Sequence, residues 1–328
     1  MKYLLIDTAN LFFRARHVAR RGSTIDEKIG LALHIIFTSI AKQWRDQSAD
    51  HVVFFLDGRS WRKDIYERYK KNRQMARAAL SKKEQEEDVE FWNAYHSFLE
   101  YLQEKTNCTV ILAQNAEADD TIARFIDAHP KDEHLVVSSD SDLQQLVRKN
   151  VELFNGISKH VYTSKGVFNE SGDHVLDKKT KKQLPAPDPE WIIFEKCIRG
   201  DASDFIFSAY PGAPMKSSKK RVGIKEAFAD RNKKGYNWNN FMLQRWVDHT
   251  DKEHRVLDDY NRNRQLIDLQ EQPKQIKEEI DEAIKAACVV KDTRQIGTHF
   301  LKFCGKWDLI KMTENTNNYL GFLSARYK

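Results

Sequence analysis

Short apolar runs alternate with helical patterns through the first half of the chain. The runs are nearly continuous in apolar residues, many of them β-branched or aromatic, and they are Tyr3–Ile6, His51–Leu56, Thr109–Leu112 and Leu135–Val137. Continuous rather than alternating apolar residues are typical of strands that are buried on both faces, as in a parallel sheet. We therefore predict a parallel sheet at the centre of an α/β domain.

Helical patterns fill the intervals between these strands. The predicted helices are Ile25–Gln47, Glu84–Lys105, Asp119–Ala128 and Asp142–Arg148. A further strand is predicted at Val151–Phe154. Residues Val161–Phe168, together with the turn-forming segment 169–173, are typical of a hairpin that extends the same domain.

Three prolines, Pro185, Pro187 and Pro189, punctuate the chain at the point where strand patterns give way to helical ones. We predict an α/β domain over residues 1–187 and a mostly helical domain over residues 188–328. Asp7 interrupts the first apolar run too early for a signal peptide, and no run is long enough to span a membrane. Four cysteines without a CxxC pair favour free thiols and a cytoplasmic protein.

Acidic residues follow the predicted strands. They are Asp7, Asp57, Glu117, Asp119, Asp120, Asp140 and Asp142. The carboxyl ends of parallel strands share one edge of a sheet, where α/β proteins bind their ligands. A single acid in such a place is often only a helix N-cap, and this is the preferred interpretation of Asp120 or Asp142 taken alone.

Acids at four strand ends are harder to explain as caps, because carboxylates in one place repel one another unless a cation compensates them. Oxygen ligands without nearby His or Cys select Mg²⁺ or Mn²⁺. Asp201 and Asp204, spaced to face the same way on a helical turn, are candidates for a second ion of a two-metal site. On its own, such a pair is more often a capped turn.

Basic residues are concentrated in two segments. The 328-residue chain has a net charge of only +6, but residues 59–83 hold ten Lys or Arg against two acids, with Trp61, Tyr66 and Tyr69 among them. Residues 216–234 hold eight Lys or Arg against two acids. A basic run with interleaved aromatic residues favours nucleic-acid binding over a merely solvated surface.

Taken together, these residues resemble the 5′-nuclease or flap endonuclease superfamily, and within it the phage ribonuclease H enzymes that remove RNA primers. The matching segments are Leu5–Asp7, Phe55–Asp57, Trp61–Asp64 through Tyr69–Arg73, Glu117–Asp120, Ser138–Asp142 and Gly200–Asp204. The resemblance covers roughly residues 1–230. It implies a resolvase-like or PIN-like, Rossmann-type nuclease domain with a basic helical arch at about 59–100, followed by a helical domain that grips duplex.

The resemblance also implies roles for individual residues. A first metal would be held by Asp7, Asp57, Asp119 and Asp140 with Glu117 close by, and a second by Asp142, Asp201 and Asp204, partly through water. Arg62 and Lys70 match cations at the base of the arch that contact the scissile phosphate, and Tyr69 is a candidate for stacking on a terminal base. Further nucleic-acid contacts are expected from Arg59, Lys63, Lys71, Arg73, Lys216, Lys219, Lys220, Arg221 and Lys225.

One departure from the family's pattern lies after Asp204. The family usually continues with Asn and a Gly-rich helix-hairpin-helix that binds potassium, whereas this chain has Phe205 and then a proline-containing loop. Duplex binding by residues 216–234 is therefore expected to be electrostatic, and the potassium site is in doubt.

The resulting hypothesis is an Mg²⁺-dependent 5′→3′ exonuclease and flap endonuclease with two ions, for which Mn²⁺ would substitute. It would act as a monomer on branched or nicked DNA and RNA–DNA duplexes with a free 5′ end. A sliding clamp or a single-strand-binding protein is a candidate partner, and the apolar tail, 315–328, would either dock on a clamp or pack on its own domain. Two alternatives stay open: a PIN-type ribonuclease, and a non-catalytic nucleic-acid-binding replication protein.

Overall fold

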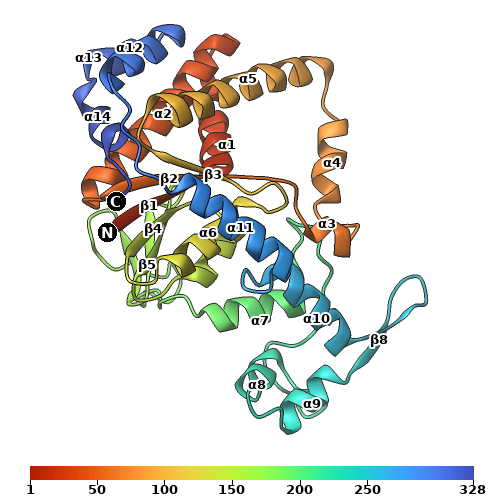
Figure 1. Ribbon diagram of the computed structural model, residues 1–328. Coiled ribbons are helices and arrows are strands. Elements are labelled where there is room, and N and C mark those ends of the chain that lie inside the picture. Colours follow the sequence, from red (N-terminus) through yellow and green to blue (C-terminus); the bar gives the residue numbers. More distant parts are fainter. The chain divides into compact units, whose positions relative to one another are not determined.

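A seven-stranded sheet forms the framework of the computed structural model (Figure 1), which describes residues 1–328 apart from the side chain of Arg21. The strand order is β3-β2-β1-β4-β5-β6-β7. The strands are β1 (Lys2–Asp7), β2 (His51–Leu56), β3 (Thr109–Leu112), β4 (Glu133–Val137), β5 (Val151–Asn155), β6 (His160–Thr163) and β7 (Gly166–Asn169). β1 to β5 pair in parallel, and β6 and β7 add an antiparallel hairpin at one edge. The predicted α/β fold class is confirmed.

The central strands are buried on both faces, as their continuous apolar sequences predict. Leu4 and Ile6 of β1 pack into one core with helices α1 (Thr8–Val18), α2 (Ile25–Asp46) and α5 (Lys82–Lys105). On the opposite face, Phe55 of β2 makes an edge-on contact with Phe125 of α6 (Ala118–Ala128), with 5.5 Å between the ring centroids. Because both faces are covered, the strands fix the position of whatever follows their carboxyl ends.

The chain divides into two compact units, and the division differs from the predicted one in two places. Unit 1 comprises residues 1–60, 80–186 and 274–328, and unit 2 comprises residues 61–79 and 187–273. The boundary after residue 186 lies at the predicted prolines. In the first place, residues 274–328 belong to unit 1, because apolar side chains of this segment are part of its core. In the second, residues 61–79 of the basic segment belong to unit 2.

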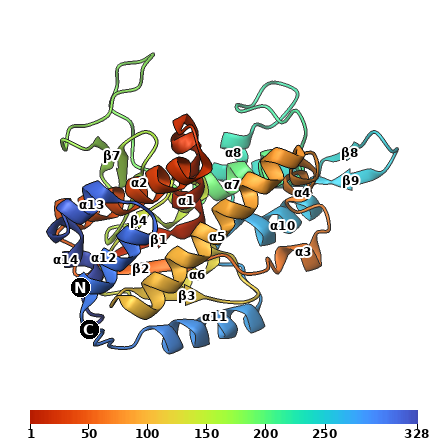
Figure 2. The same ribbon diagram turned by 90° about the horizontal axis from the view of Figure 1, so that it is seen from above.

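The C-terminal helices of unit 1 are α11 (Lys274–Ala287), α12 (Ile296–Lys306), α13 (Ile310–Glu314) and α14 (Asn317–Ser324). Helix α11 runs beside α6 and β3 (Figure 2), where Arg124 and Asp281 form an ion pair of 2.5 Å. Tyr319, Phe322 and Leu323 of α14 are buried in the core with α2. The tail therefore packs on its own unit, which was one of the two outcomes expected for it.

Unit 2 is mostly helical. Its helices are α3 (Arg62–Ile65), α4 (Lys71–Ala78), α7 (Pro189–Arg199), α8 (Ile224–Ala229), α9 (Tyr236–Met242) and α10 (Val256–Ile267). A short antiparallel pair, β8 (Arg245–Val247) and β9 (Glu253–Arg255), leads into α10. Its core includes Phe194, Ile198 and Phe241, together with Tyr69 from the basic segment.

Some local features were not predicted. Helix α1 begins directly after Asp7, which caps it, and the β8–β9 pair lies where only helical spacing was expected. The predicted helix 142–148 is a 3₁₀ helix over Ser141–Leu146. Across the described residues, no helix is both long and apolar enough to cross a bilayer, and all four cysteines are unpaired.

A buried histidine at the start of β2 makes the stability of unit 1 sensitive to acid. His51 is fully buried between the Thr109 hydroxyl, 2.8 Å from its Nε2, and the Ala325 carbonyl, 3.0 Å from its Nδ1. Burial is the main cause that lowers the pKa of His51 to about 4. The unfolded chain binds a proton near pH 6.5 and the folded chain does not, so stability falls as the pH drops from about 6.5 towards 4.

We predict that the free energy of unfolding contributed by His51 decreases by about 2 kcal/mol between pH 6.5 and pH 5. Urea unfolding at both pH values, compared between the wild-type protein and His51→Gln, isolates this contribution from other titrating groups. The glutamine variant should show the shallower loss. Equal pH dependence in the two proteins would show that His51 titrates normally in the fold.

Candidate active site

Asp7 lies at the centre of an acidic cluster in unit 1. It ends β1 and caps α1, where its carboxylate accepts hydrogen bonds from the Asn10 backbone at 3.2 Å and from Ser138 Oγ at 2.7 Å. Its exposed fraction is only 6%. Burial, then the negative charge of Asp57, and to a smaller extent that of Asp140, raise the pKa of Asp7 to about 7, against the two hydrogen bonds that lower it. The sheet thus brings the carboxylates of three strand ends close enough to repel one another.

Backbone geometry fixes the other two members of this group. Asp57 follows β2 and is exposed, and its Oδ1 accepts a hydrogen bond of 2.9 Å from the backbone N–H of Ala118, at the start of α6. Next to it, a Cβ on Gly58 would lie 2.1 Å from the Ala113 carbonyl, so only glycine fits there. Asp140 follows β4, and its Oδ1 accepts from the Asp142 backbone at 2.9 Å.

Three uncharged residues hold the cluster together, and the sequence analysis missed them. The Ser138 hydroxyl donates to Asp7 and accepts from the Asp140 backbone at 3.0 Å, so it links two strand ends. The side-chain Oδ1 of Asn10 accepts from the Ser139 backbone N–H at 3.0 Å and from the Ser139 hydroxyl at 2.8 Å. Their sequence signal is slight: Asn10 lies three residues after Asp7, and the serines directly precede Asp140.

The acids of the 117–120 segment lie at the start of α6. Asp120 is fully buried, and its Oδ2 accepts from the Glu117 backbone at 3.4 Å. It is thus the third residue of a capping box whose N-cap is Glu117, and not the N-cap itself as preferred from the sequence. Glu117 and Asp119 are half-buried in the same turn, next to the Ala118 N–H that binds Asp57. Within the part of the chain that the structure describes, no three His, Cys, Asp or Glu side chains have the mutual arrangement of a formed metal site. The all-oxygen donors and the repulsion around Asp7 nevertheless suit a hard divalent cation.

Asp201 in unit 2 is compensated by a cation of the protein itself. Its carboxylate forms an ion pair of 2.7 Å with Lys196 and accepts hydrogen bonds from Ser203. Burial acts to raise the pKa of Asp201, but the Lys196 and Ser203 contacts outweigh it and hold that pKa below its ordinary value. Its neighbour Gly200 has φ 76°, a left-handed conformation that suits glycine, and this turns the chain into the acidic loop.

Asp204 is the anchor of the basic segment within unit 2. It accepts hydrogen bonds from the Tyr69 hydroxyl at 3.0 Å and from Arg73 at 2.6 Å, and Lys70 Nζ lies 3.6 Å away. The backbone of Lys70 also donates to the Asp204 carbonyl at 2.9 Å. The Asp201 and Asp204 carboxylates therefore both have cationic partners in the protein.

Two residues expected to touch nucleic acid are buried. Tyr69 is 3% exposed in the core of unit 2, so the stacking on a terminal base expected of it does not fit its position. Arg62 is 2% exposed, donates from Nε to the Leu266 carbonyl at 2.7 Å and lies over the Trp61 ring. These contacts give Arg62 a structural task in unit 2, in place of the open phosphate contact expected from the sequence.

The remaining predicted cations are exposed. Arg59 adjoins the acidic cluster in sequence, and its backbone donates to the Gln114 carbonyl at 2.7 Å, whereas Lys63 and Lys71 belong to unit 2. The second basic segment forms a loop that is closed by the Gly223 backbone donating to Ser217 Oγ at 2.9 Å. This loop and the first turn of α8 present the exposed side chains of Lys216, Lys219, Lys220, Arg221 and Lys225.

Comparisons with known proteins identify the framework. Residues 2–172 match the family model described as the 5′-3′ exonuclease, N-terminal resolvase-like domain. The flap endonuclease of bacteriophage T5, solved with DNA and metal ions, has a similar fold, with a TM-score of 0.58 and 20% identity over 96% of this chain and 100% of that one. A T5 5′-exonuclease with bound zinc is similar, at a TM-score of 0.58 and 19% identity over 88% of this chain and 99% of that one.

We predict that Asp57→Asn stabilises the metal-free protein by about 1 kcal/mol at pH 8, because it removes the charge that acts most on Asp7. Below its raised pKa, Asp7 binds a proton in the folded state, so the repulsion grows as the pH rises from about 4 to 7. The gain should therefore shrink at pH 5. Urea unfolding in the presence of a chelator measures it, and Glu133→Gln, an exposed acid at the opposite end of β4, is the control. Loss of stability in Asp57→Asn at both pH values would contradict a repulsive cluster.

We predict that Asp204→Ala loosens the basic segment of unit 2, because Tyr69, Lys70 and Arg73 lose their common acceptor. Trypsin should cut within residues 70–77 at least several times faster in this variant than in the wild-type protein. Glu67→Gln is the matched control, since the Glu67–Lys71 pair is exposed and such pairs contribute little. Equal cutting rates in Asp204→Ala and Glu67→Gln would show that Asp204 does not anchor the segment.

Proposed function

The chain belongs to the 5′-3′ exonuclease family and is a nuclease, and from this premise we propose that it is a divalent-metal-dependent 5′→3′ exonuclease and flap endonuclease. Its substrates would be DNA or RNA–DNA duplexes with a free 5′ end, including RNA primers. One observation carries the proposal: at the carboxyl edge of a parallel sheet, burial together with the charges of Asp57 and Asp140 raises the pKa of Asp7. A fold that keeps such a repulsive group has a use for the cation that relieves it.

The carboxylates of unit 1 are the proposed ligands. Asp7, Asp57 and Asp140 would hold Mg²⁺, with Asp119 and Glu117 nearby at the start of α6. A bound divalent ion supplies water activation at neutral pH and stabilisation of charge on the phosphoryl oxygens. The second ion expected from the sequence draws on Asp201 and Asp204, whose charges the protein's own cations already compensate.

The uncharged neighbours have a positioning task in this proposal. Ser138 keeps one Asp7 oxygen engaged at 2.7 Å and orients the backbone of Asp140. Asn10 fixes Ser139 and so the turn that carries Asp140. These bonds limit the movement of the carboxylates, which keeps them ready for a cation without reorganisation of the backbone.

The basic residues would bind the phosphates of the substrate. Lys70 and Arg73 are oriented by Asp204, and the exposed cations of the 216–225 segment offer a surface for duplex. Phosphate contacts depend on shape and charge rather than sequence, so substrate choice would follow the geometry of a junction or end. The T5 flap endonuclease with a similar fold was solved with DNA, which supports a nucleic-acid substrate.

Two alternatives receive less support. A PIN-type ribonuclease would share the acidic sheet edge, but the family match is to 5′-3′ exonucleases. A non-catalytic nucleic-acid-binding protein would use only the basic surfaces. Such a protein has no reason to keep Asp7, Asp57 and Asp140 together at a cost in stability.

We predict Mg²⁺-dependent cleavage of a 5′-flap substrate that a chelator abolishes and that Mn²⁺ restores. Asp140→Asn should slow cleavage by about 100-fold or more, because it removes one ligand charge while keeping the side-chain shape. Parallel assays with DNA flaps and RNA-tipped flaps measure the preference for primer removal. Asp132→Asn, a change at the opposite end of β4, serves as the control. Full activity of Asp140→Asn would refute the assignment of the metal ligands.

A further inference from the structure

A cavity of about 600 Å³ lies within unit 2, beside the β8–β9 pair. Its lining includes Tyr66, Arg68, Phe207, Trp246 and Lys252, and it contains none of the residues to which a catalytic or metal-binding role was assigned. Its volume is within the range of pockets that bind small organic groups. No function was predicted from the sequence for Phe207, Trp246 or Lys252.

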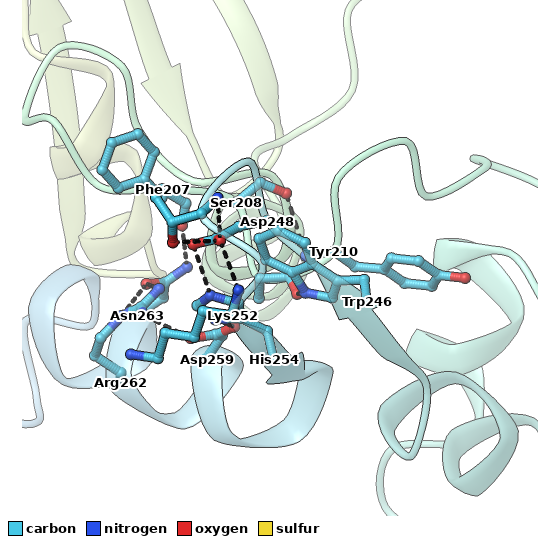
Figure 3. Close-up of polar contacts among 12 residues, drawn as sticks. Phe207, Ser208, Tyr210, Trp246, Asp248, Lys252, His254, Asp259, Arg262 and Asn263 are labelled. Atoms are coloured by element: carbon cyan, nitrogen blue, oxygen red, sulfur yellow. Dashed lines mark hydrogen bonds and ion pairs between the residues drawn. The ribbon is translucent and has the colours of Figure 1, made fainter.

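A network of charged side chains makes one wall of this cavity (Figure 3). His254 lies between two carboxylates, with Nδ1 2.9 Å from Asp259 and Nε2 3.2 Å from Asp248. Asp259 also accepts from Arg262 at 2.5 Å. Asp248 accepts from the backbones of Thr250 and Lys252, so it shapes the turn between β8 and β9. The wall is thus held by bonds that reach both the hairpin and α10.

Aromatic rings line the same cavity. The Trp246 ring stacks on the His254 ring, with 4.4 Å between the ring centroids and 14° between the planes. The Nε1 of Trp246 donates to the Ala209 carbonyl at 2.9 Å. Phe207 is 44% exposed, so its ring is accessible from solvent. The buried Asn263 donates to the Phe207 carbonyl at 2.8 Å and so fixes its backbone. Flat rings held in place but open to solvent suit a flat aromatic ligand.

Two cations at the cavity are available for an anion. Arg68 lies 5.2 Å from the Phe207 ring centroid, and over the described residues neither Arg68 nor Lys252 has a carboxylate partner within ion-pair distance. Arg262 differs, since Asp259 compensates it, and it lies over the Tyr66 ring. A ligand that fits has an aromatic plane and a nearby negative charge, which are the two parts of a nucleotide.

We propose that this cavity binds one unpaired nucleotide of a nucleic-acid strand, with the base against Phe207 and Trp246 and the phosphate on Arg68 and Lys252. The proposal rests on the proposed function for its choice of ligand, because a nuclease that acts on branched substrates meets unpaired nucleotides. An apolar peptide would also fit the rings. It would leave Arg68 and Lys252 without an anion, so the presence of these two cations favours the nucleotide.

Binding is measured without cleavage, in the presence of a chelator, by fluorescence anisotropy with two labelled probes: an eight-nucleotide oligothymidine and an abasic strand of the same length. The wild-type protein should prefer the oligothymidine. Phe207→Ala should reduce that preference by about 5-fold or more, the effect of one lost stacking contact. Trp246→Ala should do the same. Tyr236→Ala removes an aromatic ring of unit 2 that is 77% exposed and lies outside the cavity, and it should keep the wild-type preference.

Photo-crosslinking with 5-iodouracil in the oligothymidine locates the base. Crosslinked peptides that contain Phe207 or Trp246 support the proposal. Crosslinks found only elsewhere, together with an unchanged preference in Phe207→Ala, would overturn it, and so would binding of the oligothymidine no tighter than the abasic strand. Phe207 is exposed, so its variant tests the cavity even if Trp246→Ala fails to fold. Absence of metal-dependent cleavage by the wild-type protein would instead refute the proposed function, whatever the binding result.

Discussion

The repulsion among Asp7, Asp57 and Asp140 is the constraint on which the account of unit 1 depends. The strands that carry these residues cannot move apart, because Leu4, Leu5 and Ile6 beside Asp7 are fully buried between two layers of helices. Ser138 and Asn10 restrict the turns further. The fold therefore holds negative charge in one place, and burial of Asp7, together with the charges of Asp57 and Asp140, raises its pKa to about 7. A divalent cation or a proton relieves the repulsion, and only the cation does so above pH 7.

The acids of unit 2 have different surroundings. Asp201 and Asp204 have cationic partners, and Asp204 gathers Tyr69, Lys70 and Arg73 from the basic segment. Acids that resemble metal ligands in sequence thus differ in their surroundings. In unit 1 the charges of Asp57 and Asp140 act on a buried Asp7 and raise its pKa, whereas the acids of unit 2 organise basic side chains that nucleic-acid phosphates can contact.

The sequence was most informative where one physical rule dominates. Continuous apolar runs identified β1 to β4, and the acids after them marked the edge where the cluster forms. It was least informative where contacts are distant in sequence. The return of residues 274–328 to unit 1 depends on packing of α12 and α14 against α2, which no local pattern reveals. Burial of Tyr69 and Arg62 likewise follows from the core of unit 2, and polar positioning by Ser138 has no signal beyond its neighbour Asp140.

If the carboxylates around Asp7 bind a divalent ion, metal binding must release protons from them. Calorimetric titration of Mg²⁺ or Mn²⁺ at about pH 6.5, in buffers with different ionisation enthalpies, counts them. We expect metal binding to displace the proton that the folded state holds on Asp7, with a release of roughly 0.5 to 1 proton that disappears above about pH 8. Metal binding that releases no proton at pH 6.5, or no binding at all, would contradict it.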